Sequence, residues 1–281
     1  MPPELTFGDI AGFRLVTSNL PRLAAFYRAI GFDVGEPVPI SAAEMALLGI
    51  AGNGVRIAMT LGPSRVDLDC YAGAGRPYPS ERSASDRIFQ HLAIVTDDVG
   101  TAWERASAAG ATPISRRQPV ALPASSGGVI AVKLRDPDGH PLEFTRFSPG
   151  ANPDWQGTGI LGIDHSAIAV ADLSASRRFY AQHGLVEGAP MLNQGPTQVA
   201  LDGIDDVVLD IVPMLPAQAP PHIELLGYRG RPGGGVDLAA NDIAATRIVW
   251  HADHDALVRD PDGHYHQLSR AGRPQGENPL R

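Results

Sequence analysis

Two histidines and two glutamates are spaced in the sequence in a way that suits metal binding or proton transfer. His91 is followed by Glu143 in HPLEF, and His165 is followed by Glu224 in HIELL. Imidazole nitrogens and carboxylate oxygens bind borderline divalent ions, and a positioned carboxylate can also move a proton. A single histidine on a strand is more often a hydrogen-bonded core residue than a ligand. Whether these residues form a functional site or are ordinary core residues therefore depends on the strands that carry them.

Strand alternation predicts which way these side chains project. Leu142 and Phe144 are apolar neighbours of Glu143, so the carboxylate is expected on the opposite face of its strand. Glu224 shares a face with His222, two residues earlier, so His222 is either a rival ligand or a supporting group. Each imidazole is thus matched by a carboxylate on a later strand.

Three segments repeat one pattern of a strand, a capping residue, an amphipathic helix and a glycine. They are Phe13–Phe32, Phe89–Ala111 and Ile163–Leu185, with caps at Asn19, Asp98 and Asp172 and glycines at Gly31, Gly110 and Gly184. Short strand-like runs follow at Val55–Leu61, Val129–Asp136, Thr197–Gly203, Val207–Met214 and His222–Tyr228. The repeated unit is therefore predicted to be strand–helix–strand–strand–strand, at a period of roughly 60–80 residues.

A fourth copy is incomplete. Ala245–Ala252 resembles a first strand, but the next strand-like residue, Ala256, follows too soon for a crossover of about a dozen residues, so this module should lack its helix.

The stretch RDPDGH occurs at Arg135–His140 and again at Arg259–His264. It has the form of a type I turn and should join the last two strands of modules two and four. We expect turn chemistry there, with His140, His264 and His266 exposed to solvent.

The linker-like segment 149–159, rich in Pro and Gly, divides the chain into two predicted domains. The first covers 1–148, with modules 5–80 and 86–148. The second covers 160–270, with modules 160–230 and 236–270, and 271–281 is expected to be a polar tail.

Composition excludes several classes of protein. The formal net charge of −8 argues against a nucleic-acid or anionic-membrane binder. No apolar run of about 18 residues or secretion signal is evident, so a cytoplasmic protein is expected. A single cysteine excludes an intrachain disulfide and a cysteine-based zinc site.

The strand IDHSAIAVADL, the helix ending in FY and the closing RDPDGHPLEF resemble the vicinal oxygen chelate superfamily. This group contains glyoxalase I, bleomycin-resistance proteins, epimerases and extradiol dioxygenases. The resemblance implies an α+β fold of four βαβββ modules, the last truncated, whose paired modules form half-barrel sheets around a cleft. It also implies that any metal takes ligands from the first and last strands of each paired module.

Those positions are His91, Glu143, His165 and Glu224 in modules two and three. In the outer modules they are Gly12, Asp67, a position near Thr246, and Gln267. If neighbouring modules pair, two incomplete sites result. If inner pairs with inner, as in similar fused glyoxalases, one complete site of two histidines and two glutamates results, and this is the arrangement we expect.

The resemblance implies a metal-dependent lyase or isomerase of the glyoxalase or epimerase kind. The metal would be nickel, zinc, cobalt, manganese or iron, and the substrate a small molecule with vicinal oxygens that reacts through an enediolate, with Glu143 or Glu224 as the base. The alternatives are an extradiol-type dioxygenase, whose two-His-one-carboxylate set fits less well, and a metal-free drug-binding protein. Either a monomer or a homodimer is compatible with four fused modules.

Overall fold

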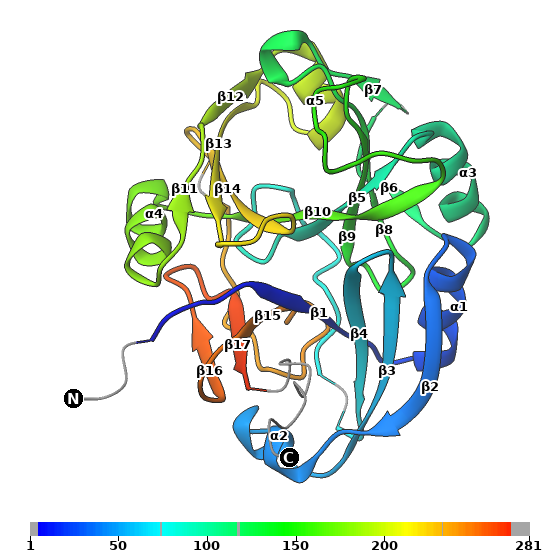
Figure 1. Cartoon of the computed structure of the whole chain (residues 1–281), viewed down its shortest axis with the longest axis vertical. Coiled ribbons are helices and arrows are strands. Elements are labelled where there is room, and N and C mark those ends of the chain that lie inside the picture. Colours follow the sequence, from blue (N-terminus) through cyan, green and yellow to red (C-terminus); the bar gives the residue numbers. More distant parts are fainter. Residues whose placement is uncertain (1–4, 74, 117–118, 232, 271–281) are drawn as a thin grey trace, which may run out of the picture.

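The computed structural model describes residues 5–73, 75–116, 119–231 and 233–270. Within these residues the chain forms two curved sheets, one of seven strands and one of ten, with helices packed at their sides (Figure 1). No helix in this part of the chain has the length and hydropathy needed to cross a membrane. The predicted tail 271–281 lies outside the described residues.

The seven-stranded sheet, here called the outer sheet, combines modules one and four. Its order is β16-β17-β15-β1-β4-β3-β2, and β1 pairs antiparallel with β15. Its strands are β1 (Ile10–Val16), β2 (Asp33–Pro39), β3 (Gly54–Leu61), β4 (Ser64–Tyr71), β15 (Arg247–His251), β16 (Ala256–Arg259) and β17 (Tyr265–Ser269).

The ten-stranded sheet, here called the inner sheet, combines modules two and three. Its order is β11-β13-β14-β10-β5-β9-β8-β6, with β12 added to β13 and β7 to β8. Its strands are β5 (Gln90–Thr96), β6 (Thr112–Pro113), β7 (Val120–Ala121), β8 (Ile130–Arg135), β9 (Pro141–Arg146), β10 (Ile160–Ala169), β11 (Val186–Glu187), β12 (Met191–Gln194), β13 (Val208–Leu215) and β14 (His222–Tyr228). The antiparallel β5–β10 pair joins modules two and three, as the resemblance implied.

The three long helices begin and end as their sequences predict. They are α1 (Leu20–Ala29), α3 (Val99–Ala108) and α4 (Leu173–Gln182). Asn19, Asp98 and Asp172 each accept a hydrogen bond from a backbone N–H in the first turn, which satisfies an otherwise unpaired donor. Past each helix stands a glycine with a positive φ, at Gly31, Gly110 and Gly184.

The prediction of a strand at Thr197–Gly203 is wrong. This segment lies almost wholly in the short helix α5 (Pro196–Asp202). Pro196 occupies the first turn, where its missing N–H costs nothing, and Gly203 ends the helix in the left-handed conformation with φ 70°. The alternation of Val199 and Leu201 suggested a strand, but the flanking Pro and Gly determine the element. Two further short helical segments are α2 (Ala42–Leu47) and the 3₁₀ turn η1 (Ala124–Ser126).

Module four has no helix, as predicted, because β15 passes directly to β16. The main hydrophobic core combines residues from both sheets with the inner faces of α1, α3 and α4, including Phe26, Ile94, Val99, Tyr180 and Ile248. This shared core holds the two sheets in one molecule.

The two RDPDGH turns connect β8 to β9 and β16 to β17, as predicted, and each fastens one sheet to the other. In the first, Asp136 accepts backbone N–H bonds from within the turn and a bond from the Tyr27 hydroxyl of α1, while His140 Nε2 lies 2.9 Å from the Val16 carbonyl of β1. Module two of the inner sheet is thereby tied to module one of the outer sheet. We call this set of bonds a clasp.

The second clasp repeats these bonds between modules four and three. Asp260 accepts from the Tyr180 hydroxyl at 2.8 Å, and His264 Nε2 lies 3.0 Å from the Ala169 carbonyl. His140, His264 and His266 are all buried, so their predicted exposure is wrong. The tyrosines that complete the clasps come from helices distant in sequence, and this tertiary partnership could not be read from the turn itself.

Candidate functional site

The four predicted ligand residues lie on one face of the inner sheet, in two adjacent rows. In one row Ala93 of β5 stands opposite Glu143 of β9 and opposite His165 of β10. In the next row Ala167 of β10 stands opposite His91 and opposite Glu224 of β14. The two alanines are small and fully buried, so they leave space above the sheet for the four longer side chains. The rows also bring His222 beside His165.

The imidazoles and carboxylates come together as two pairs. His91 Nε2 lies 3.2 Å from Glu143 Oε2, and His165 Nε2 lies 3.4 Å from Glu224 Oε2. The rings of His91 and His165 have their centres 5.6 Å apart. Atoms that share one metal ion through bonds of about 2.1 Å lie roughly 3.0–3.4 Å apart, so each pair already has a spacing suited to a common ion.

A β-bulge positions His165. The register of β10 against β5 shifts between Ile163 and His165, so Asp164 is the extra residue. Asp164 accepts from His165 Nδ1 at 2.9 Å and from the Trp155 indole N–H at 2.6 Å. This fixes the imidazole with Nε2 toward Glu224, in the carboxylate–histidine arrangement common behind metal ligands.

Donor atoms of Asp164, His165 and His222 all lie within 4.8 Å of one another, which makes them an alternative set of three ligands. We favour Asp164 as a positioning residue, because both of its oxygens already accept hydrogen bonds from His165 and Trp155. His222 Nε2 lies 3.9 Å from Glu224 Oε1, so His222 is close enough to serve as an additional ligand.

Lys133 and Asp202 belong to the same site, although sequence reasoning missed them. Lys133 of β8 stands opposite Glu143, with Nζ 3.7 Å from Glu143 Oε2 and 2.7 Å from Asp202 Oδ1 at the end of α5. A lysine inside the apolar strand VIAVKLRD is an unusual residue for a buried position, and that was the available signal. The buried ammonium offsets part of the negative charge of the carboxylates.

Electrostatic coupling perturbs the groups of this site. Burial lowers the pKa of His91. Burial alone would also lower the pKa of His165, but the Glu224 and Asp164 carboxylates raise it to about 9. Burial alone would raise the pKa of Glu143, yet Lys133 and the neighbouring imidazole hold it below its ordinary value. Burial alone would likewise raise the pKa of Glu224, but His165 and His222 lower it to about 2, so both glutamates are ionised at neutral pH.

The residues present fit a divalent ion. Both ring nitrogens of His91 are buried, and neither has a hydrogen-bond partner among the described residues, because the contact with Glu143 lacks hydrogen-bond geometry. Such an unpartnered buried polar group is costly unless something else binds it. Two imidazoles and two carboxylates form a donor set that suits zinc, nickel, cobalt, manganese or iron.

The outer sheet has the same architecture with different side chains. A bulge in β1 between Ile10 and Gly12 matches the bulge in β10, and Gly12 takes the place of His165. In the strand register, Arg14 of β1 stands opposite Asp67 of β4, as Ala167 of β10 stands opposite Glu224 of β14. The residue predicted near Thr246 is corrected by the strand register: Val249 stands opposite Gln267, so Arg247 occupies the place of His91. The missing helix of module four made this alignment ambiguous in the sequence.

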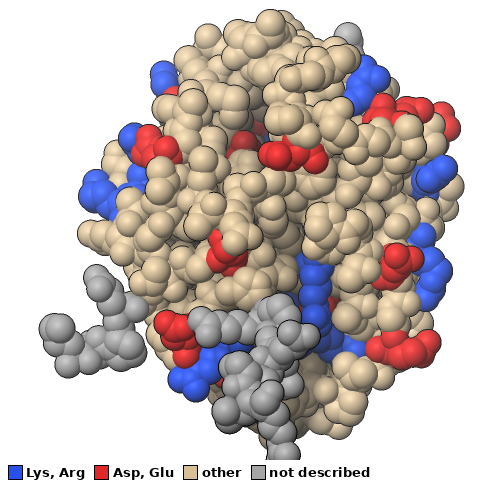
Figure 2. Space-filling model, viewed as in Figure 1, with Lys and Arg blue, Asp and Glu red and all other residues tan. Residues whose placement is uncertain are grey.

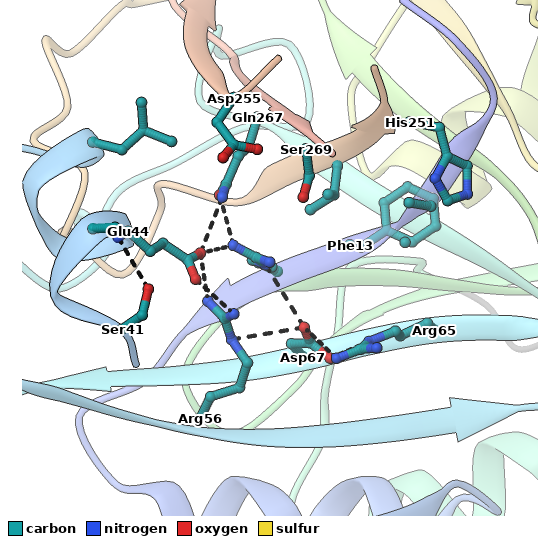
Figure 3. A pocket seen from close by; sticks show the side chains of 16 residues that line it. Phe13, Ser41, Glu44, Arg56, Arg65, Asp67, His251, Asp255, Gln267 and Ser269 are labelled. Atoms are coloured by element: carbon teal, nitrogen blue, oxygen red, sulfur yellow. Dashed lines mark hydrogen bonds and ion pairs between the residues drawn. The ribbon is translucent and has the colours of Figure 1, made fainter. Parts of the chain in front are cut away.

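Over the outer sheet lies a pocket with a volume of about 720 Å³ (Figure 3). Its lining includes Arg14, Glu44, Arg56, Arg65, Asp67 and Gln267. In the lower half of the face shown in Figure 2, basic side chains lie in a recess where Figure 1 shows β1 and β4.

Residues 9–144 match the family model described as the Glyoxalase/Bleomycin resistance protein/Dioxygenase superfamily. This match places residues 9–144 of the chain in that superfamily. A mutant form of glyoxalase I from Zea mays superposes with a TM-score of 0.61 at 16% identity, over 92% of this chain and 91% of that chain. The unmodified maize enzyme gives a TM-score of 0.58 at 15% identity, over 92% and 91% of the two chains.

A Bacillus subtilis protein provisionally described as a dioxygenase superposes with a TM-score of 0.55 at 13% identity, over 94% of this chain and 85% of that chain. At these identities the solved structures establish the fold of nearly the whole chain and leave its reaction open. A search of curated proteins finds no sequence that matches this chain.

Proposed function

We propose that the chain is a metal-dependent lyase or isomerase of the glyoxalase or epimerase kind. His91, Glu143, His165 and Glu224 would hold one divalent ion, and the substrate would be a small molecule with two adjacent oxygens that reacts through an enediolate. The observation that supports this proposal is that two imidazole–carboxylate pairs, one from each inner module, lie on one face of the inner sheet with their imidazole centres 5.6 Å apart.

When bound, the ion would withdraw electrons from the substrate oxygens and acidify the neighbouring C–H. The chain's own residues would do the remaining work. Glu143 and Glu224 are ionised carboxylates at this face, and either can take the proton and return it. Asp164 holds His165 in place, and Lys133 holds Glu143 through the ion pair at 3.7 Å.

Two alternatives remain in view. An extradiol-type dioxygenase would use a facial set of two histidines and one carboxylate, so that more positions stay open for catechol and oxygen. A metal-free binding protein is favoured by one observation, the large pocket over the outer sheet, which lies away from the proposed metal ligands. That pocket is considered separately below.

The first test is metal content. The purified protein should contain about one divalent ion per chain by elemental analysis. His91→Ala and His165→Ala should lose it, whereas His254→Ala, in the loop between β15 and β16, should retain it. Less than a tenth of an ion in the unmodified protein after growth and dialysis with each candidate metal would contradict the proposal.

The second test is proton transfer. Hemithioacetals of 2-oxoaldehydes, acyl thioesters and catechols would be incubated in heavy water, and exchange at the reacting carbon followed by NMR. Exchange that Glu143→Gln or Glu224→Gln abolishes would identify the base. Oxygen consumption with a catechol would instead support the dioxygenase alternative.

A further inference from the structure

The pocket over the outer sheet is not explained by the proposed chemistry of the inner sheet. It lies between β1, β4, β15, β17 and the short helix α2 (Figure 3). A volume of about 720 Å³ is within the range of small-molecule sites, roughly 300–1,000 Å³. Because the two sheets have the same architecture, corresponding positions can be compared directly.

The comparison shows that the outer sheet lacks both imidazoles of the proposed set, has gained arginines, and keeps a carboxylate at one of the four positions, Asp67 in the place of Glu224. Arg14 stands where the inner sheet has Ala167, and Arg247 stands where it has His91. Gly12 and Gln267 stand in place of His165 and Glu143. Guanidinium groups repel a metal ion and favour oxyanions, which they bind through several N–H donors. With no imidazole and a single carboxylate at these four positions, the outer cleft does not repeat the proposed metal site, and Arg14 in its lining can donate to an anion.

Arg14, which lines the pocket, does not use all of its hydrogen-bond donors. Its Nη1 donates to Gln267 Oε1 at 2.8 Å and also contacts Glu44. Its Nε is buried without a hydrogen-bond partner among the residues that the structure describes; the nearest carboxylate oxygen, Asp67 Oδ2, is 3.7 Å away. Only 9% of Arg14 is exposed, and burial together with the nearby Arg56 lowers its pKa to about 10. An additional acceptor oxygen would satisfy this group.

Glu44 shows which chemical group fits between these cations. Its carboxylate accepts two bonds from Arg56, at 2.9 and 3.0 Å, and one from Gln267 Nε2 at 3.0 Å (Figure 3). Glu44 comes from the six-residue helix α2, whose Ala43 and Leu47 also line the pocket. A side-chain carboxylate thus lies at the arginines, at the edge of a pocket with room for a larger molecule.

We propose that the outer cleft binds a small organic carboxylate with an apolar body. The carboxylate of the ligand would bind Arg14 and displace Glu44 from the arginines, and the apolar part would pack against Leu47 and Val249, which line the same pocket. Glu44 then acts as an internal competitor that keeps the cleft closed to weak ligands. This site is independent of the metal proposed for the inner sheet.

The test uses benzoate as the probe and benzyl alcohol as its uncharged counterpart, with binding to the full chain measured by isothermal titration calorimetry. Benzoate should bind, and benzyl alcohol should bind at least tenfold more weakly. Arg14→Gln should weaken benzoate binding at least tenfold. Arg28→Gln removes the same charge from an exposed position of α1 outside the pocket lining and should leave the affinity unchanged.

Two further variants test the pocket if Arg14→Gln does not fold. Ala43→Trp places a large side chain in the pocket and should abolish binding. Glu44→Gln removes the competing charge and should tighten benzoate binding about tenfold, whereas a merely structural Glu44 would give weaker or unchanged binding. No benzoate binding by the unmodified protein, or equal binding by the Ala43→Trp variant, would overturn the proposal. His91→Ala should bind benzoate normally, so failure here is separable from failure of the metal proposal.

Discussion

His266 should make the fold sensitive to mild acid. The Trp250 indole N–H donates to His266 Nδ1 at 3.0 Å, so the other ring nitrogen carries the proton and donates to the Tyr180 oxygen, also at 3.0 Å. The ring is fully buried and stacks on Phe7. Burial lowers its pKa to about 4; the nearby Asp260 raises the value, and His264 and His183 lower it further. The folded state therefore requires neutral His266.

The direction and size of the effect follow from linkage. An unfolded histidine has a pKa of about 6.5, so as the pH falls the unfolded chain takes up this proton first. The stability that neutral His266 contributes is present above pH about 6.5 and is lost as the pH falls toward 4. From the folded value of about 4, the loss is about 2 kcal/mol between pH 7 and pH 5, and about 3 kcal/mol in total.

The measurement compares urea unfolding of the unmodified protein and His266→Gln at pH 7, 6 and 5. The variant will be less stable at pH 7, because it loses the ring contacts. The difference in unfolding free energy between the two proteins should shrink by about 2 kcal/mol at pH 5, since only the unmodified protein carries this linked proton. His254→Gln, in the loop between β15 and β16, serves as the control for removing a histidine. A difference that stays constant, or that grows as the pH falls, would refute the reasoning.

Two substitutions test the buried charge and the clasp. Lys133→Met should destabilise the fold by about 3–5 kcal/mol in urea unfolding, because Glu143 and Asp202 lose their buried cation; a loss below about 1 kcal/mol would mean that the lysine matters little. Tyr27→Phe removes the donor to Asp136 and should cost about 1–3 kcal/mol. A matched Tyr180→Phe change should cost a similar amount if the two clasps are equivalent, and thermal unfolding that is unchanged in both variants would contradict that role.

The repeated modules could be predicted because their signals are local. A capping side chain such as Asp98, a 3.6-residue apolar period and a glycine such as Gly110 are all readable within one segment. The same is true of the strand positions of His91 and His165. The pairing of β5 with β10 brings these two histidines together. This pairing could be predicted only from the family resemblance, because no local pattern in the sequence indicates it.

The errors arose where distant segments decide the outcome. His140 and His264 follow a polar turn, but helices and strands from other modules bury them. The position that corresponds to His91 was predicted near Thr246 and is Arg247, because module four lacks the helix that would anchor its alignment. Lys133 was not predicted as a site residue, because its partner Asp202 comes from another module. The pocket over the outer sheet likewise depends on α2 meeting strands from both ends of the chain.

The crossed pairing of the modules has a consequence for fragments of this chain. Strands β1 and β5, from the first half, are completed by β15 and β10 from the second half. A first half produced alone would keep its clasp through Asp136 but would expose both strand edges, which invite self-association or aggregation. Two halves separated between residues 149 and 159 and produced together should instead associate, because each supplies the strands that the other lacks. This protein is therefore a candidate for a split reporter.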